Sequence, residues 1–372
     1  MKKVLAFMLA AMMMASMAVG CGNDGNTSSA DAGTPTDTSS AEATDGEEPA
    51  EEPAADASDV SIGSCVYKFD DTFMTGVRNT MTARAAELGA TIDIVDSQNK
   101  QPTQNEQVDT FITKGVNALI VNPVDLTAAG PIITKAKDAG LPIVLQNRQP
   151  SEEDMNSYDQ AWYVGCKAEQ SGTMSGEIIA DYFTANPDAD KNGDGTIQYV
   201  MLQGEPGHQD ATLRSEYAPK AIEEAGFKVE QLAADTAMWD KVKATDLMAA
   251  FISSQGIDKI EAVLCNNDDM ALGAIEALKA EGYNSGDESK YIPVVGVDAT
   301  APALEAMKEG SLLGTVLNDA TSQGNASVNI AVAAAQGKEI TEENIGYPVT
   351  DDKYVWIDYV KVTQDNYQDY IS

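Results

Sequence analysis

The chain has 372 residues, 43% of them hydrophobic, and its formal net charge at pH 7 is −35. This length suffices for two domains, and the hydrophobic fraction is high enough for each of them to have a core. Because so acidic a chain repels phosphate groups, we expect it to bind neither nucleic acid nor anionic lipid headgroups.

The N-terminus has the features of an export signal. Lys2 and Lys3 precede a short apolar run at residues 4–19, which ends in small residues before Cys21. This pattern is typical of a signal peptide, here residues 1–20. Small residues before a cysteine resemble a bacterial lipobox, and two or more acyl chains on the cysteine anchor a protein stably to a membrane. We therefore expect Cys21 to be lipidated; the alternative is an ordinary signal peptide followed by an unrelated cysteine.

A low-complexity segment follows, at residues 21–58. It is rich in Ser, Thr, Ala, Pro, Gly, Asp and Glu, and it contains no Lys, Arg or aromatic residue. Such a segment cannot bury enough apolar surface to offset the entropy lost on ordering. We expect a disordered acidic linker that holds a folded body away from the membrane.

Strands and helices alternate from residue 60 to residue 146. The apolar patterns and turn residues predict strands at 60–69, 91–95, 118–121 and 142–146, and helices at 74–88, 102–114 and 128–138. Continuous apolar strands that alternate with helices indicate a parallel sheet with helices on both faces.

The same alternation begins again after residue 165. Helices are predicted at 171–184, 218–225, 242–253, 270–280 and 302–308, and strands at 198–202, 228–232, 262–265, 294–297 and 313–317. A long helix at 323–335 and a strand at 354–362 complete the chain. Two successive units of this kind predict an α/β fold with two doubly wound parallel-sheet lobes.

The folded body contains Cys65, Cys166 and Cys265. An odd number of cysteines argues against a full disulfide framework, and no two of them have the spacing of metal ligands. We expect three free thiols; the alternative is one disulfide with one unpaired cysteine.

The first candidate site is the segment 202–214, which holds His208, the only histidine of the chain, with Asp210 and Arg214. It directly follows the predicted strand 198–202, and open α/β sheets bind their ligands at strand ends. An imidazole, a carboxylate and a guanidinium together suit the hydroxyl groups of a sugar.

Polar side chains follow other strands as well. The candidates are Asp71, Asn122, Asn267, Asp298 and Asn318. Each of them alone could be a helix cap, as Asp71 illustrates, but their recurrence at strand ends predicts one shared crevice.

Two aromatic residues, Phe73 and Trp239, lie beside these polar groups in the sequence. An aromatic face can lie against the C–H face of a pyranose, although either residue could instead belong to a core.

Residues 190–198 match the first part of an EF-hand loop. Its oxygen ligands would be Asp190, Asn192, Asp194, the Thr196 carbonyl and Gln198, around one structural Ca²⁺. The twelfth position of the loop, normally a glutamate, is Met201, so a carboxylate from elsewhere is needed. The alternative is a polar surface turn.

The sequence gives little support for an enzyme. The segment 204–207 is not followed by the Lys-Ser/Thr of a phosphate loop, and no serine lies in a nucleophile elbow. His208 and Asp210 have no paired nucleophile in the sequence. We therefore expect no catalysis.

Several segments of the folded body carry a resemblance to a known family. They are YKFDDTF at 67–73, DSQN at 96–99, GEPGH at 204–208, DTAMWD at 235–240, NND at 266–268, GVDA at 296–299 and GTVLND at 314–319. In these segments the chain resembles the D-galactose/D-glucose-binding proteins of bacterial sugar ABC importers, which have the periplasmic binding protein type I fold.

The resemblance implies two lobes, joined by three hinge crossings, that close on one pyranose. One lobe would comprise residues 59–165 plus 319–356, and the other 166–318 plus 357–372. The sugar would be bonded by Asp71, Asn122, His208, Asp210, Arg214, Asn267, Asp298 and Asn318, and its ring would lie between Phe73 and Trp239. The family's calcium loop is completed by a distant glutamate, which corresponds to Glu261 here.

The implied function is that of a lipid-anchored extracytoplasmic substrate-binding subunit of a sugar ABC importer. It would act as a monomer, bind galactose, glucose or both, and deliver them to a permease and its ATPase. The lipobox suggests the surface of a Gram-positive cell, with the membrane contacted only through the anchor. The alternatives are a sugar-sensing presenter for a chemoreceptor or histidine kinase, and a carrier of the ribose or arabinose type.

Overall fold

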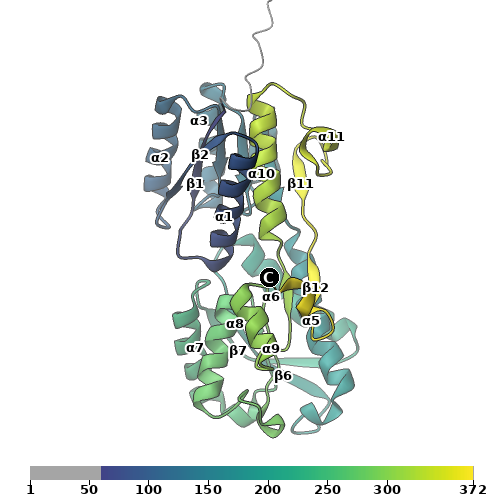
Figure 1. Cartoon of the computed structure of the whole chain (residues 1–372). Coiled ribbons are helices and arrows are strands. Elements are labelled where there is room, and N and C mark those ends of the chain that lie inside the picture. Colours follow the sequence, from purple (N-terminus) through teal and green to yellow (C-terminus); the bar gives the residue numbers. More distant parts are fainter. Residues whose placement is uncertain (1–59, 372) are drawn as a thin grey trace, which may run out of the picture. The chain divides into compact units, whose positions relative to one another are not determined.

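The structure is a computed structural model that describes residues 60–371, all within one compact unit (Figure 1). The expected signal peptide at 1–20, the lipidated Cys21 and the linker at 21–58 lie outside the described residues. Within residues 60–371, no helix is both long enough and apolar enough to cross a bilayer.

The first lobe is built on a six-stranded parallel sheet. Its strands, in spatial order, are β11 (Tyr354–Trp356), β5 (Ala161–Gly165), β4 (Ile143–Gln146), β3 (Ala118–Val121), β1 (Ser61–Val66) and β2 (Thr91–Asp96). Its helices are α1 (Thr72–Glu87), α2 (Gln101–Lys114), α3 (Ala129–Asp138), α4 (Glu152–Asn156), α10 (Ala320–Ala335) and α11 (Glu342–Ile345).

The alternation of side chains along each strand gives this lobe two cores. In β3, Ile120 packs with residues of α1 and α10, whereas Leu119 and Val121 pack with residues of α2 and α3. Successive strand residues point to opposite faces, so a strand that is apolar throughout must be covered on both. The predicted three-layer arrangement follows directly from this pattern.

The second lobe has a four-stranded parallel sheet. Its strands, in spatial order, are β7 (Lys228–Thr236), β6 (Thr196–Gln203), β8 (Ala262–Cys265) and β9 (Val294–Val295). Its helices are α5 (Ala168–Ala185), α6 (Gln209–Glu224), α7 (Lys241–Gln255), α8 (Asp268–Ala280) and α9 (Ala301–Lys308). Residues of α5 and α6 pack in one core, and residues of α7, α8 and α9 in the other.

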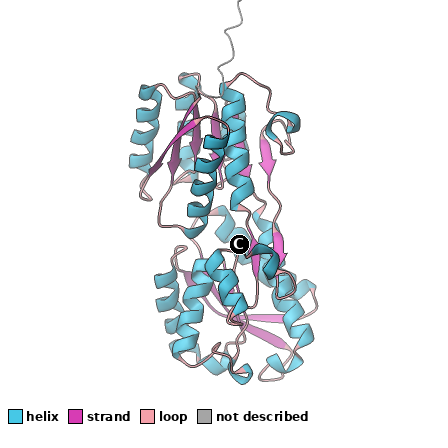
Figure 2. Cartoon of the chain, viewed as in Figure 1, coloured by secondary structure: helices cyan, strands magenta, loops and turns pink. Residues whose placement is uncertain are grey.

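Three chain crossings join the two lobes that Figure 2 shows. β5 leads through Cys166 and Lys167 into α5, and β10 (Thr315–Leu317) leads through Asn318 and Asp319 into α10. Residues 357–359 connect β11 to β12 (Val360–Val362), which pairs antiparallel with β10. The predicted fold, with two parallel-sheet lobes and three crossings, is confirmed.

Two of the differences between the predicted and the observed element boundaries bear on the fold. The predicted strand 354–362 is in fact two strands, because residues 357–359 pass from one lobe to the other and β11 and β12 pair in different sheets. The helix predicted at 218–225 begins at Gln209 and continues through Pro219. A proline removes one backbone donor, and packing of α6 against α5 supports the helix around it.

The three cysteines of the described residues are free thiols. Cys65 lies in a core of the first lobe, Cys265 in a core of the second, and Cys166 at a crossing between them. They lie in different parts of the fold, and none of them forms a disulfide within residues 60–371.

Candidate functional site

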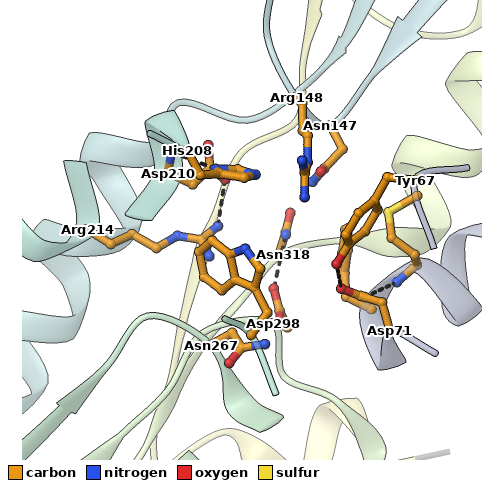
Figure 3. Close-up of a pocket in the computed structure, with 13 residues that line it drawn as sticks. Tyr67, Asp71, Asn147, Arg148, His208, Asp210, Arg214, Asn267, Asp298 and Asn318 are labelled. Carbon is orange, nitrogen blue, oxygen red and sulfur yellow. Dashed lines mark hydrogen bonds and ion pairs between the residues drawn. The ribbon is translucent and has the colours of Figure 1, made fainter. Parts of the chain in front are cut away.

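A cavity lies between the lobes, where the carboxyl ends of both sheets converge (Figure 3). Its volume is about 370 Å³ including its opening to solvent. It is lined by Tyr67, Asp71, Phe73, Met74, Asn147, Arg148, His208, Asp210, Arg214, Trp239, Asn267, Asp298 and Asn318. Residues from both lobes therefore surround any ligand that it holds.

All the predicted ligand-binding residues except Asn122 line this cavity. Asn122 is fully buried behind it, with its Oδ1 accepting from the Tyr67 N–H at 3.2 Å and its Nδ2 donating to the Gln146 carbonyl at 3.0 Å. The prediction that Asn122 faces the ligand is corrected, because its amide is already bonded to the backbone of two neighbouring strand ends.

The sequence reasoning missed Tyr67, Met74, Asn147 and Arg148. Asn147 and Arg148 directly follow β4, so the strand-end rule could have found them. Asn147 has a φ of 62°, a left-handed conformation that asparagine adopts more readily than most residues. The fully buried Tyr163 donates its hydroxyl to the Asn147 carbonyl at 2.8 Å and holds this turn in place.

Asp71 has a structural role and also lines the cavity. Its Oδ1 accepts from the Met74 N–H at 2.7 Å and caps α1, so the helix-cap interpretation is correct. Its Oδ2 accepts a hydrogen bond from the Tyr67 hydroxyl. The carboxylate is therefore held by two donors on its own lobe and presents its remaining lone pairs to the cavity.

Trp239 depends on a glycine for its position. Met238 and Trp239 both have positive φ, at 57° and 61°, a costly conformation for residues of this size. The indole lies directly on Gly204, where a Cβ would overlap the ring. The His208 ring meets the indole edge-on, with centroids 5.1 Å apart. The platform is thus held rigidly from two sides.

His208 is a neutral hydrogen-bond donor at this site. It caps α6, and its Nδ1 accepts from the Asp210 N–H at 3.1 Å. Burial, together with Arg148 and Arg214 nearby, holds the pKa of His208 well below its usual value. Because Nδ1 is an acceptor in the neutral ring, the proton resides on Nε2, which is free to donate to a ligand.

Arg214 is fixed by partners on several elements. Its Nε donates to Ser171 Oγ at 3.0 Å, and its Nη1 donates to the Asn266 carbonyl at 2.8 Å. Its Nη2 donates to Asp210 Oδ2 at 3.0 Å and to the Tyr359 hydroxyl at 2.9 Å. The guanidinium is therefore pre-oriented before a ligand arrives, which lowers the entropic cost of binding.

Asp298 occupies a strained position. Its φ is 125°, and its Oδ1 accepts from Asn318 Nδ2 at 3.1 Å. Strain of this kind persists where neighbours hold the backbone, here through the bond from the Asp298 N–H to the Val316 carbonyl. Asn267, beside it, accepts from the Met270 N–H with its Oδ1 and caps α8.

In the predicted calcium loop, the acidic side chains accept hydrogen bonds from the backbone of the loop itself. Asp190 accepts from the N–H groups of Gly193 and Gly195, at 2.7 and 2.8 Å. Asp194 accepts from the Thr196 N–H and from the side-chain amides of Asn192 and Gln198. Among residues 60–371, no three His, Cys, Asp or Glu side chains are grouped as they would be around a metal ion.

Glu261 lies beside this loop. It is 2% exposed and accepts from the N–H groups of Lys191 and Gln198, at 2.7 and 3.2 Å. Burial raises the pKa of its carboxyl, and Asp190 contributes in the same direction. The candidate ligands all offer oxygen, which is the donor type that Ca²⁺ prefers. The oxygen atoms of the loop and the buried carboxylate of Glu261 beside it therefore fit Ca²⁺.

The chain is similar to several known proteins. A sequence model of the periplasmic binding protein domain matches residues 62–339. The chain is 44% identical over 320 residues to the D-galactose/methyl-galactoside binding periplasmic protein MglB of Haemophilus influenzae, covering 86% of this chain and 94% of that protein. It is 30% identical to the xylitol-binding protein of Mycolicibacterium smegmatis, covering 78% of this chain and 77% of that protein.

Among solved structures, the chain is similar to an ABC transporter solute binding protein from Bacillus halodurans with bound myo-inositol. The TM-score is 0.70 and the sequence identity 35%, over 84% of this chain and 97% of that one.

The first prediction concerns Asp268, which lies fully buried behind the cavity. Burial raises the pKa of its carboxyl from 3.8 to about 7, although the hydroxyl of Thr315 donates to it at 2.6 Å. Between these two pH values the folded state binds more protons than the unfolded chain, so this residue's contribution to stability falls as pH rises. Between pH 5 and pH 8, the unfolding free energy of the wild type should therefore fall by about 1–3 kcal/mol more than that of Asp268→Asn.

Urea unfolding of the ligand-free protein at both pH values measures this difference. Asp246→Asn, at an exposed position of α7, is the control and should follow the wild type. Equal pH dependence in the wild type and Asp268→Asn would contradict the prediction.

Proposed function

The chain belongs to the periplasmic binding protein family, and on that premise we propose that it is the substrate-binding subunit of a bacterial ABC sugar importer. Its ligand is D-galactose, D-glucose or both. The observation that carries this proposal is the cavity, in which carboxylates, amides, one neutral imidazole and one guanidinium lie beside two aromatic faces. MglB, the relative at 44% identity, is a galactose-binding protein by name.

The side chains divide the work of binding by their chemistry. Asp71, Asp210 and Asp298 accept from sugar hydroxyls, while His208 Nε2 and Arg214 donate to ligand oxygens. The faces of Phe73 and Trp239 cover the apolar C–H surfaces of the ring. Nothing in this set supplies a nucleophile, and the relatives are binding proteins rather than enzymes.

Transport uses closure of the lobes. A ligand that contacts both lobes stabilises the closed form over the open one, because only the closed form makes both sets of contacts. The permease and its ATPase then recognise the closed, loaded form. A chemoreceptor that recognises the same form would be an additional partner, and the protein acts as a monomer.

Isothermal titration with D-galactose, D-glucose, D-ribose and L-arabinose tests the proposal. Galactose or glucose should bind, and Asp298→Asn should weaken binding by about 10–100-fold, because one charge-assisted hydrogen bond is lost. Glu216→Gln, at an exposed position on α6, should bind like the wild type. Binding of ribose or arabinose, with none of galactose or glucose, would show that the ligand is wrong.

We also propose that the loop at 190–198 binds a structural Ca²⁺. Asp190, Asn192, Asp194, the Thr196 carbonyl, Gln198 and Glu261 would hold the ion. The ion would supply positive charge among three acidic side chains whose present donors are backbone N–H groups and the side-chain amides of Asn192 and Gln198.

Removal of metal should lower the melting temperature, because an ion that binds only the folded state stabilises it by mass action. Glu261→Gln should abolish the response to Ca²⁺, whereas Glu230→Gln, an exposed position on β7, should retain it. Identical melting curves with and without Ca²⁺, after elemental analysis shows the metal gone, would rule out this site.

The N-terminal sequence supports a further proposal on location, namely a lipid anchor on Cys21 at the outer face of a Gram-positive cell membrane. Cys21→Ala should move the expressed protein from the membrane fraction to the soluble fraction. Ser28→Ala, in the same segment, is the control and should remain with the membrane. A wild-type protein that fractionates as soluble would refute the anchor.

A further inference from the structure

We propose that Glu205 is a positioning residue, which stabilises the closed form through bonds to Arg148 and Asn99. We call these three side chains the clasp. The inference rests on the proposed sugar-binding function and deepens it, because it assigns part of the binding energy to a residue that does not line the cavity.

The clasp connects the two lobes directly. Glu205 follows β6 in the second lobe, whereas Asn99 and Arg148 follow β2 and β4 in the first. Its Oε2 accepts from Arg148 Nη2 at 2.9 Å, and its Oε1 accepts from Asn99 Nδ2 at 3.0 Å. One carboxylate thus binds two separate loops of the opposite lobe.

The ion pair within the clasp is largely shielded from water. The side chains of Arg148 and Glu205 are 5% and 13% exposed. The clasp's bond from Asn99 to Glu205 is exposed, as is another bond between the lobes, from Thr72 Oγ1 to Asp269, so the Arg148–Glu205 pair contributes most. Exposed polar pairs contribute little, whereas loss of one partner from a shielded ion pair leaves the other charge uncompensated.

Arg148 also links the clasp to the ligand site. Its Nη1 donates to the Val124 carbonyl at 2.6 Å, and its guanidinium lies over the Tyr67 ring, 4.1 Å from the centroid. Tyr67 in turn donates its hydroxyl to Asp71 in the cavity. Closure therefore fixes Arg148. Arg148 packs on Tyr67, and Tyr67 orients the carboxylate of Asp71 in the cavity.

The effect of Glu205 on affinity follows from the difference between the two forms. When the lobes part, Arg148 and Glu205 separate and water solvates each of them, so the pair contributes only to the closed form. Apparent affinity scales with the fraction of protein that can adopt the binding-competent form. Loss of the clasp should therefore weaken sugar binding without removing a contact to the sugar.

The test measures the binding kinetics and the separation of the lobes. Glu205→Gln should weaken binding of the better hexose about tenfold, mainly through faster dissociation, because loss of a buried charged partner acts on dissociation more than on association. Asn99→Asp, which places two carboxylates opposite each other, should weaken binding as well. The double variant, Asn99→Asp with Glu205→Gln, should bind more tightly than Asn99→Asp alone and regain most of the lost affinity. The amide introduced at position 205 can donate to the carboxylate introduced at position 99. Glu216→Gln should match the wild type.

A second readout works without any sugar. With one spin label on each lobe, the ligand-free Glu205→Gln variant should show a distance distribution shifted toward the open form relative to the wild type. Affinity within twofold of the wild type for both Glu205→Gln and Asn99→Asp would overturn the clasp. If the wild type binds no monosaccharide, the proposed function is wrong. The clasp is then tested by the spin labels alone, and a distance distribution of Glu205→Gln equal to that of the wild type would overturn it.

Discussion

The carboxyl ends of two parallel sheets meet at one cavity, and this constraint places most of its side chains. β1 and β4 end there in the first lobe, and β6 and β8 end there in the second. Neither lobe alone provides more than part of the wall. A ligand in this cavity therefore contacts both lobes at once.

The cavity wall is rigid because its polar groups are bonded to protein before a ligand arrives. The Arg214 guanidinium donates to four groups, and Asp71 and Asn267 cap helices with one oxygen each. Side chains held in this way lose little entropy on binding. The strained backbone at Asp298 and Trp239 has the same effect, because contacts within the fold, and not the ligand, offset the free-energy cost of the strain.

The sequence predicted the two-lobed fold because the strands are continuous and apolar and because helices alternate with them regularly. It predicted most of the site because polar residues at strand ends stand out against those strands. The rule that polar residues at strand ends face the ligand failed where the local backbone conformation sets the direction of the side chain. Asn122 and Asn147 both follow strands, but Asn122 turns inward to backbone partners while Asn147 adopts a left-handed conformation at the cavity.

Other misses arose from tertiary context. Residues 354–362 have strand propensity throughout, so their pattern predicts one strand, and only the family resemblance indicates a change of lobe after residue 356. The start of α6 at Gln209 was not placed from the sequence, and the packing of α6 on α5 offsets the donor that is missing at Pro219. The clasp was beyond sequence reasoning, because Asn99, Arg148 and Glu205 are far apart in the sequence and only the fold brings them together.

The surroundings of the three thiols determine how readily they react. Burial raises the pKa of Cys65 to about 12 and holds the pKa values of Cys166 and Cys265 far above their usual range. The thiolate is the reactive species in disulfide exchange, and the raised pKa values keep the thiolate fraction low, so burial slows oxidation and mixed-disulfide formation at these thiols. Folding therefore protects these three thiols, and none of them forms a disulfide within residues 60–371.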